Sequence, residues 1–184
     1  RQMCIRDRHW TGVEPDILVT GKGLSGGVYP IAATCYRAEL NPFLHDNPFI
    51  HISTFGGAEV GCPVALEVLA LTAEPAFLQR VRELAARLAS GFDVLQARYP
   101  DTLVGVRQLG TMIGLVFPDE ACGPLMSKLM FDEGVLAIYA NNDHHVLQFL
   151  PPLIMTDLEA EEALGALDRA LSTLSQAFGW RVEH

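Results

Sequence analysis

A lysine surrounded by glycines is the first feature of the sequence that could do chemistry. Lys22 follows the apolar run DILVT (residues 16–20) and lies within GKGLSGG (residues 21–27). A lysine held away from water loses its proton more readily, and the free amine can attack a carbonyl carbon. The neighbouring glycines leave room for a bulky cofactor against the backbone. The simpler alternative is a solvated turn lysine, and the spacing alone favours that alternative.

Two known phosphate-binding loops resemble this glycine cluster superficially, and neither fits it. A P-loop places its lysine after the glycines and at the start of a helix, whereas Lys22 precedes Gly23, Gly26 and Gly27. The dinucleotide fingerprint GxGxxG can be laid over residues 21–26, but we expect no helix after it and find no acidic residue to complete a βαβ unit. The order and context of these residues therefore exclude both phosphate loops.

A second polar cluster, HISTFGG at residues 51–57, places the hydroxyls of Ser53 and Thr54 beside a Gly-Gly turn. Such hydroxyls can donate hydrogen bonds to a phosphate, although clusters of Ser, Thr and Gly are usually plain loops. His144 and His145 are adjacent, and adjacent side chains on a strand point to opposite faces, so they are poor partners for a metal. We expect no metal site.

The elements that must position these residues follow from hydrophobic periodicity. In the first part of the chain the pattern predicts a buried strand over 16–20, an extended segment over 28–36, a loop-rich stretch over 41–57 and a helix from about 59. A second helix follows from about 75 to 99, and then strands over 103–108 and 111–117. The last predicted elements are a helix over 124–134, strands over 135–139 and 145–149, and a final helix capped by Thr156 or Asp157. The buried stripe expected for the final helix is Leu158, Leu164, Leu167, Leu171, Leu174 and Phe178.

This order predicts an α/β fold class with two parts. Residues 1–74 have the pattern of the end of a βα-type layer, too small to close a sheet by itself. Residues 75–184 have the pattern of a compact α+β domain.

The bulk composition limits the classes of partner. Apolar residues make up 49% of the 184 residues, enough for a sizeable core, and the net charge of −9 argues against nucleic acid and anionic membrane surfaces. No apolar run approaches the roughly 20 residues that span a bilayer. Four separated cysteines without a CxxC pair predict reduced, buried thiols in a cytoplasmic protein. We therefore expect small molecules or other proteins as partners.

Taken together, several stretches resemble the class III aminotransferases, which are pyridoxal-phosphate enzymes that include ornithine, acetylornithine, putrescine and 4-aminobutyrate aminotransferases. The stretches are PDILVTGKGLSGGVYP (15–30), HISTFGGAEVGCPVALEVL (51–69), VRQLGTMIGLVF (106–117) and VLQFLPPLIMTDLEAEEALGALDRAL (146–171). The combination of GKGLSGG and STFGG at this separation is far more specific than either motif alone.

The resemblance implies a fold-type I transferase, with residues 1–74 as the C-terminal remnant of the large domain that binds pyridoxal phosphate and residues 75–184 as the small domain. Lys22 would hold the cofactor as a Schiff base and carry a proton between the substrate's Cα and the cofactor's C4′ carbon. Thr54, helped by Ser53, would bind the phosphate of the neighbouring subunit's cofactor. The protein would then be a homodimer whose site is shared across the interface.

Two departures from the family refine this expectation. The family's earlier half supplies a phosphate cup, an aromatic residue on the pyridine ring and an Asp at the ring nitrogen, and this chain carries none of them. We therefore expect a C-terminal fragment that is inactive alone.

Gln148 stands where many members that use amino acids carry an arginine, and a glutamine cannot neutralise a carboxylate. Arg107 is the nearest alternative cation, although a structural arginine at a strand end is the simpler interpretation.

The hypothesis is a transaminase that moves an amino group from an amine, ω-amino acid or amino acid donor to a keto acid by a ping-pong route. One alternative is an aminomutase of the same family. A second, from a different class, is a non-catalytic α/β interaction module that keeps the sequence pattern.

Overall fold

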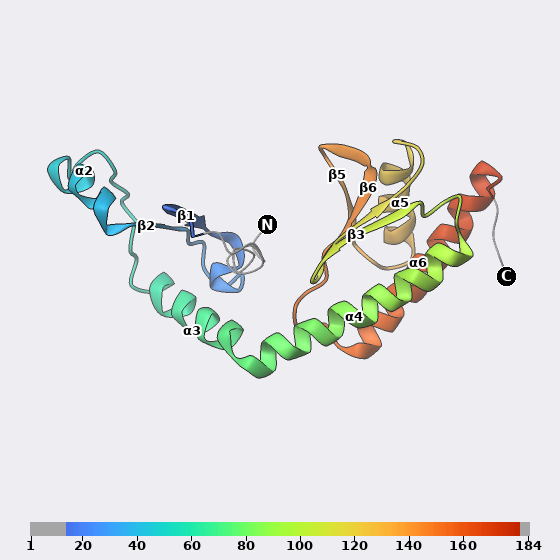
Figure 1. Ribbon diagram of the computed structural model, residues 1–184, viewed down its shortest axis with the longest axis horizontal. Coiled ribbons are helices and arrows are strands. Elements are labelled where there is room, and N and C mark those ends of the chain that lie inside the picture. The colour runs from blue at the N-terminus through green and yellow to red at the C-terminus, as the bar shows by residue number, and fades with distance from the viewer. Residues whose placement is uncertain (1–13, 181–184) are drawn as a thin grey trace. The chain divides into compact units, whose positions relative to one another are not determined.

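The computed structural model describes residues 14–180, and the chain divides into two compact units, Arg1–Phe77 and Leu78–His184 (Figure 1). We call them the N-terminal unit and the C-terminal unit. The expected boundary between residues 74 and 75 lies at the start of helix α4 (Pro75–Arg98), whereas the two units divide between Phe77 and Leu78, within its first turn.

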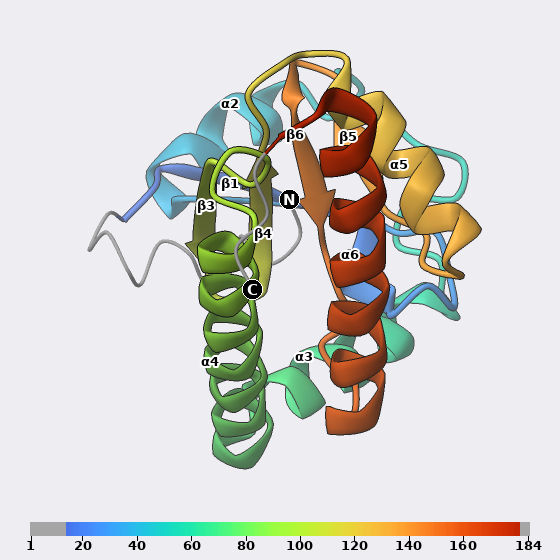
Figure 2. The same cartoon turned by 90° about the vertical axis from the view of Figure 1, so that its right-hand side faces the viewer.

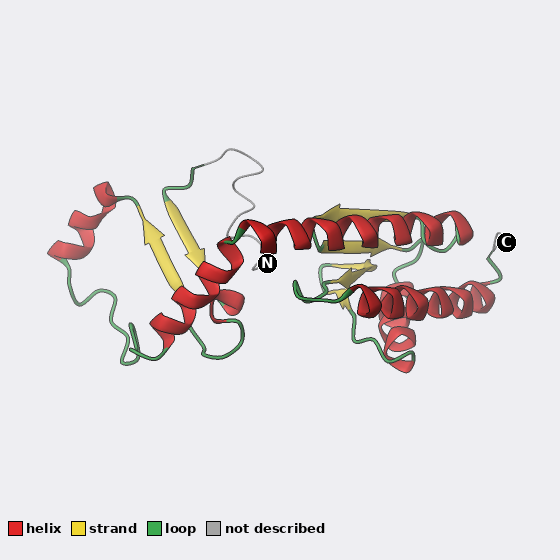
Figure 3. Ribbon diagram, turned by 90° about the horizontal axis from the view of Figure 1, so that it is seen from below, coloured by secondary structure: helices red, strands yellow, loops and turns green. Residues whose placement is uncertain are grey.

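The N-terminal unit is built on a two-stranded antiparallel sheet. Strand β1 (Ile17–Thr20) pairs with β2 (Ala33–Tyr36), and a single 3-10 turn, η2 (Lys22–Ser25), follows β1 directly. After β2 come a second 3-10 turn, η3 (Ala38–Leu40), and the helices α2 (Asn41–Asp46) and α3 (Gly61–Ala73) (Figure 3). Pro63 lies in the first turn of α3, where the missing N–H leaves no intrahelical bond unmade.

Three expectations for this unit are wrong. Strand β1 is not buried: Ile17 is 57% exposed and Val19 is 71% exposed, and within the described residues its sheet consists of β1 and β2 alone. The expected loop over 41–57 begins with α2, in which a proline occupies the first helical turn. Cys35 and Cys62 are exposed, whereas buried thiols were expected. Cys122 is buried as expected, and Cys4 lies outside the described residues.

The C-terminal unit contains a four-stranded antiparallel sheet in the order β3-β4-β6-β5. Its strands are β3 (Gly105–Leu109), β4 (Met112–Val116), β5 (Ile138–Ala140) and β6 (Asp143–Phe149). The helices are α4, α5 (Cys122–Asp132) and α6 (Asp157–Phe178). Helices α4 and α6 run side by side (Figure 2), and they are parallel, since Arg80 bonds Asp157 at one end and Arg98 bonds Asp168 further along.

One face of this sheet and the three helices enclose a single core. Alternate residues of the central strands point into it, as β pleating requires, and Phe92 of α4 meets Phe149 of β6 edge to face with ring centroids 5.4 Å apart. The fully buried large side chains are Leu84, Leu88, Phe92, Leu103, Leu115, Phe117, Met126, Met130, Leu147, Leu167, Leu171 and Leu174. Helix α4 contributes its central turns to this core, through Leu84, Leu88 and Phe92.

The stripe predicted for α6 is confirmed only in its middle. Leu167, Leu171 and Leu174 are buried, whereas Leu158 is 64% exposed and Phe178 is 41% exposed. Most of the remaining buried positions of the helix are alanines at residues 160, 163, 166 and 170. Small side chains let the helix backbone lie close to its neighbours, so the apolar contact follows the alanines instead of the outermost large residues.

The start of α6 is fixed by a capping box. Thr156 accepts a hydrogen bond from the backbone N–H of Glu159, and Glu159 Oε2 accepts one from the backbone N–H of Thr156 at 2.7 Å. These bonds hold the pKa of Glu159 below its usual value. The sequence left Thr156 and Asp157 open as the N-cap residue of this helix, and in the structure the N-cap is Thr156.

Within residues 14–180, no single helix combines the length and apolar composition needed to cross a bilayer, and only α3 and α4 taken together reach both.

The contact between α5 and the sheet leaves no space for a side chain at Gly123. A Cβ there would lie 2.0 Å from the carbonyl oxygen of His144 in β6, which is backbone and cannot rotate away. We predict that Gly123→Ala lowers the free energy of unfolding of the C-terminal unit by roughly 2–3 kcal/mol, as overpacking does. Urea unfolding followed by circular dichroism measures this.

The matched control is Gly165→Ala in α6, where a Cβ would meet its nearest neighbour, Nη1 of Arg169, at an ordinary 3.5 Å. Alanine is the better helix former, so this variant should be more stable by about 0.5–1 kcal/mol. Equal effects at the two glycines would contradict the close approach of α5 to β6.

Candidate functional site

Lys22 has an unusual backbone conformation. Its φ is 56°, and it is the single non-glycine residue with a positive φ among residues 14–180. An L-residue in the left-handed region is held there against a steric cost of about 1–2 kcal/mol. Such conformations persist where the surroundings over-determine them, and they cluster at functional sites.

The turn that carries Lys22 is anchored by its other side chains. Leu24 is 5% exposed and Ser25 is 1% exposed, whereas Lys22 itself is exposed. The turn η2 packs against α3, and a Cβ on Gly26 would lie 3.3 Å from Cγ2 of Val68 in that helix. Gly26 and Gly27 both have positive φ, of 60° and 83°, so the chain reverses here through conformations that glycine adopts freely. The turn is therefore held in place by its buried side chains, while the amine of Lys22 remains accessible.

The expectation that Lys22 is held away from water is not met by the part of the chain that the structure describes. Lys22 is exposed, and within residues 14–180 its amine has no hydrogen bond or ion pair. The strand before it, β1, is equally uncovered. An apolar environment for this amine has to come from outside these residues.

Ser53 and Thr54 lie in the loop that leads into α3, and both are exposed. The N–H of Gly56 donates to the carbonyl oxygen of Ser53 at 3.1 Å, which closes a tight turn, and Gly57 continues it with a φ of 70°. The two hydroxyls make no hydrogen bond within residues 14–180. They are free to bind a ligand; their loop leads into helix α3, against which the Lys22 turn packs.

Arg107 and Gln148 belong to the C-terminal unit and lie in one row of its sheet. Gly114 of β4 pairs with Arg107 of β3 on one side and with Gln148 of β6 on the other, so the two long side chains share a face and flank a residue without a side chain. Gln148 Nε2 donates to the carbonyl oxygen of Tyr139 at 3.4 Å. An amide and a guanidinium therefore lie on the two sides of Gly114.

The Arg107 guanidinium is already engaged in an ion pair. Its Nη1 lies 3.4 Å from Oδ2 of Asp143. Burial raises the pKa of Asp143, but hydrogen bonds from His145 and Arg107 outweigh that effect and hold its pKa below the usual value. This contact matches the structural interpretation of Arg107.

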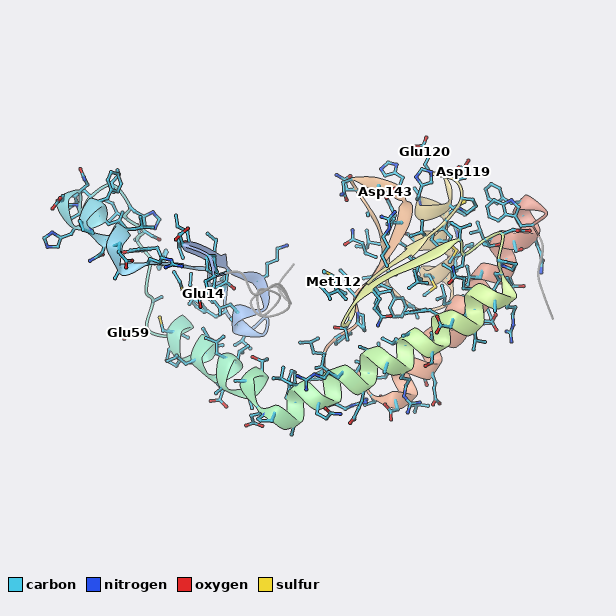
Figure 4. All side chains as sticks on the ribbon, viewed as in Figure 1. Glu14, Glu59, Met112, Asp119, Glu120 and Asp143 are labelled. Atoms are coloured by element: carbon cyan, nitrogen blue, oxygen red, sulfur yellow. The ribbon has the colours of Figure 1, made fainter. Side chains whose placement is uncertain are left out.

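The two adjacent histidines do not combine into a larger polar cluster. His144 stacks edge to face on Tyr139 with ring centroids 5.1 Å apart, whereas His145 contacts Asp143 through Nδ1 at 3.3 Å. Figure 4 shows Asp143 at the same end of the C-terminal unit as Asp119 and Glu120. In the described part of the chain no three His, Cys, Asp or Glu side chains are grouped as metal ligands would be.

The motifs that surround Lys22 and Thr54 also identify the family. Residues 7–171 match the aminotransferase class III family, which covers both units. The chain belongs to the class III aminotransferases. This match confirms the resemblance inferred from GKGLSGG and STFGG. Members of this family depend on pyridoxal phosphate.

Known class III aminotransferases support the same conclusion. An uncharacterized aminotransferase of Archaeoglobus fulgidus is 48% identical over 164 residues, which are 89% of this chain and 38% of that protein. An ornithine aminotransferase from Toxoplasma gondii, whose structure has pyridoxal phosphate at partial occupancy in its active site, is 30% identical with a TM-score of 0.76, covering 90% of this chain and 38% of its own. An acetylornithine aminotransferase from Elizabethkingia anophelis is 25% identical with a TM-score of 0.78, covering 90% and 43%.

The chain thus spans about 38–43% of the length of these aminotransferases. The similarity confirms the predicted fold class, a partial fold-type I transferase of mixed helices and sheet.

The strain at Lys22 leads to a prediction about stability. Glycine adopts positive φ without steric cost, so Lys22→Gly should stabilise the η2 turn by about 0.5–1 kcal/mol. Native-state hydrogen exchange of the amides of residues 23–29 measures the change. Lys22→Ala keeps a Cβ and therefore the strain, so it is the matched control and should give no gain. Equal exchange in the two variants would show that the backbone conformation of Lys22 is unstrained.

Proposed function

We propose that this chain is part of an aminotransferase in which Lys22 holds pyridoxal phosphate through its side-chain amine. The observation that carries the proposal is the left-handed backbone of Lys22 in an anchored glycine turn directly after β1. Strain of this kind is retained where function requires it. The protein would transfer an amino group from a donor to a keto acid.

The residues around Lys22 fit this cofactor. The amine is exposed, and a Cβ at Gly27 or Gly57 would have nothing within 4 Å, so the backbone leaves open space at both turns. The hydroxyls of Ser53 and Thr54, which we assign below to the partner subunit's cofactor, can donate hydrogen bonds to a phosphate. When bound, pyridoxal phosphate withdraws electrons from the substrate's Cα. Lys22 would then take the proton from that Cα as a base and return it as an acid.

We assign residues 1–74 to the large domain that binds the cofactor and residues 75–184 to the small domain. We further propose a homodimer in which Thr54, with Ser53, binds the phosphate of the partner subunit's cofactor. The loop around Thr54 supports this proposal, because Phe49 is 82% exposed, Ile52 75% and Phe55 82%. Apolar side chains gathered in one exposed loop are typical of a surface that a protein partner covers.

The row through Gly114 bears on the choice of amino donor. Gln148 carries no charge, and Arg107 is paired with Asp143. A donor carboxylate at this row would therefore find an amide without a free cation beside it. This arrangement favours amines and ω-amino compounds over α-amino acids as donors, with a keto acid as acceptor.

Covalent trapping tests the role of Lys22. Borohydride reduction fixes pyridoxal phosphate to the lysine that holds it, and peptide mapping identifies that lysine. In the full-length protein we expect the adduct on Lys22, and we expect Lys22→Ala to abolish it. Lys128→Ala is the control, since Lys128 is the other lysine of this chain and pairs with Asp132 on α5.

An adduct on this chain that survives Lys22→Ala would rule out the assignment. Absence of any adduct in the unaltered protein would favour the non-catalytic interaction module. If the amino group moved to another carbon of the same molecule without appearing on a keto acid, the protein would be an aminomutase.

A donor screen tests the role of Gln148. An arginine there could bind a carboxylate with two parallel hydrogen bonds, so Gln148→Arg should raise kcat/KM for α-amino acid donors by about tenfold and lower it for simple amines. Gln176→Arg, which adds the same charge on the exposed side of α6, is the matched control and should change neither value. A preference unaltered by Gln148→Arg would place the donor carboxylate elsewhere.

A further inference from the structure

The buried side chain of Ser25 forms hydrogen bonds that join the turn carrying Lys22 to the segment after it. Its hydroxyl donates to the carbonyl oxygen of Tyr29 and accepts from the backbone N–H of Tyr29 at 3.3 Å. With 1% of its surface exposed, Ser25 is one of the four buried polar residues of the described chain and the only one in the N-terminal unit. We call this pair of bonds the Ser25–Tyr29 clasp.

The clasp connects the lysine turn to helix α3. The ring of Tyr29 lies against the first residue of that helix, since a Cβ on Gly61 would be 2.7 Å from Cδ1 of Tyr29. Val68, two turns further along the same face of α3, lies against Gly26 of the same turn. The segment from Lys22 to Tyr29 is therefore held against α3 at two points, with the serine hydroxyl between them.

Three backbone bonds hold the turn. One joins Leu24 N–H to the Gly21 carbonyl at 3.3 Å and spans Lys22, and two follow the lysine, from Gly26 N–H to the Gly23 carbonyl at 2.9 Å and from Val28 N–H to the Ser25 carbonyl at 3.1 Å. A strained residue keeps its conformation only when its surroundings over-determine it. Ser25 adds a side-chain restraint that reaches beyond these bonds, from the turn to the segment that leads to β2.

We propose that Ser25 is a positioning residue: its clasp on Tyr29 holds the turn in the form that keeps Lys22 left-handed and its amine in place for the cofactor. This role rests on the proposed function of Lys22. Ser25 itself contacts no reacting atom, because its side chain is buried against Tyr29.

The test measures how fast pyridoxal phosphate is trapped by borohydride on Lys22 in the full-length protein, with Lys128 as the internal reference. A typical hydrogen bond contributes a few-fold to tenfold in an equilibrium, so Ser25→Ala should slow trapping on Lys22 by about 3- to 10-fold. It should also weaken the visible absorption band of the bound cofactor and speed hydrogen exchange of the Tyr29 amide. Ser25→Thr keeps the hydroxyl and should restore trapping to within about twofold.

Ser90→Ala is the matched control. Ser90 also donates its hydroxyl to a backbone carbonyl four residues away, that of Ala86 at 3.1 Å, but it lies on the exposed side of α4. This variant should trap like the unaltered protein. Thermal unfolding of every variant separates a local change in the turn from a loss of folding.

The outcomes distinguish this inference from the proposed function. Trapping on Lys22 that is the same in Ser25→Ala, or equally slow in Ser25→Thr when both variants are folded, would overturn the role of Ser25 alone. If the unaltered protein traps no cofactor on Lys22, the proposed function fails, and the role of Ser25 toward the cofactor fails with it.

Discussion

The packing of the η2 turn on helix α3 is the interaction on which the candidate site depends. Leu24 and Ser25 of the turn are buried, as are Gly61 and Ala65 of α3, in a unit that is otherwise open. The same helix receives the Thr54 loop at its first turn. The turn with the amine packs on this helix and the loop with the hydroxyls leads into it, so contacts within a single unit hold both segments.

The two units differ in how much of their structure they stabilise themselves. The C-terminal unit encloses a continuous core between its sheet and three helices, whereas the N-terminal unit leaves apolar side chains of β1, of the Thr54 loop and of α3 exposed. Hydrophobic burial is the main favourable term in folding. The exposed apolar side chains of the N-terminal unit are therefore a surface that other protein would be expected to cover.

Much of the fold could be predicted from periodicity, and the misses have physical causes. The elements of the C-terminal unit follow from local patterns, because each buries one face against a core that the chain itself provides. The exposure of β1 and of Cys62 could not be predicted, since burial depends on neighbours that are far away or absent. The family motif was enough to single out Lys22 and Thr54. The left-handed backbone of Lys22 and the burial of the Ser25 hydroxyl could not be predicted from residue spacing, although the sequence shows a serine between Leu24 and Gly26.

The row across the C-terminal sheet combines a tightly packed central residue with two side chains outside the core. Gly114 is confined by Val146, whose Cγ1 would lie 3.0 Å from a Cβ at that position, so a larger residue there would press on its neighbour. Gln148 and Arg107 stand on either side of it and take no part in the core. The fold therefore constrains the central position of the row more than it constrains the two flanking ones.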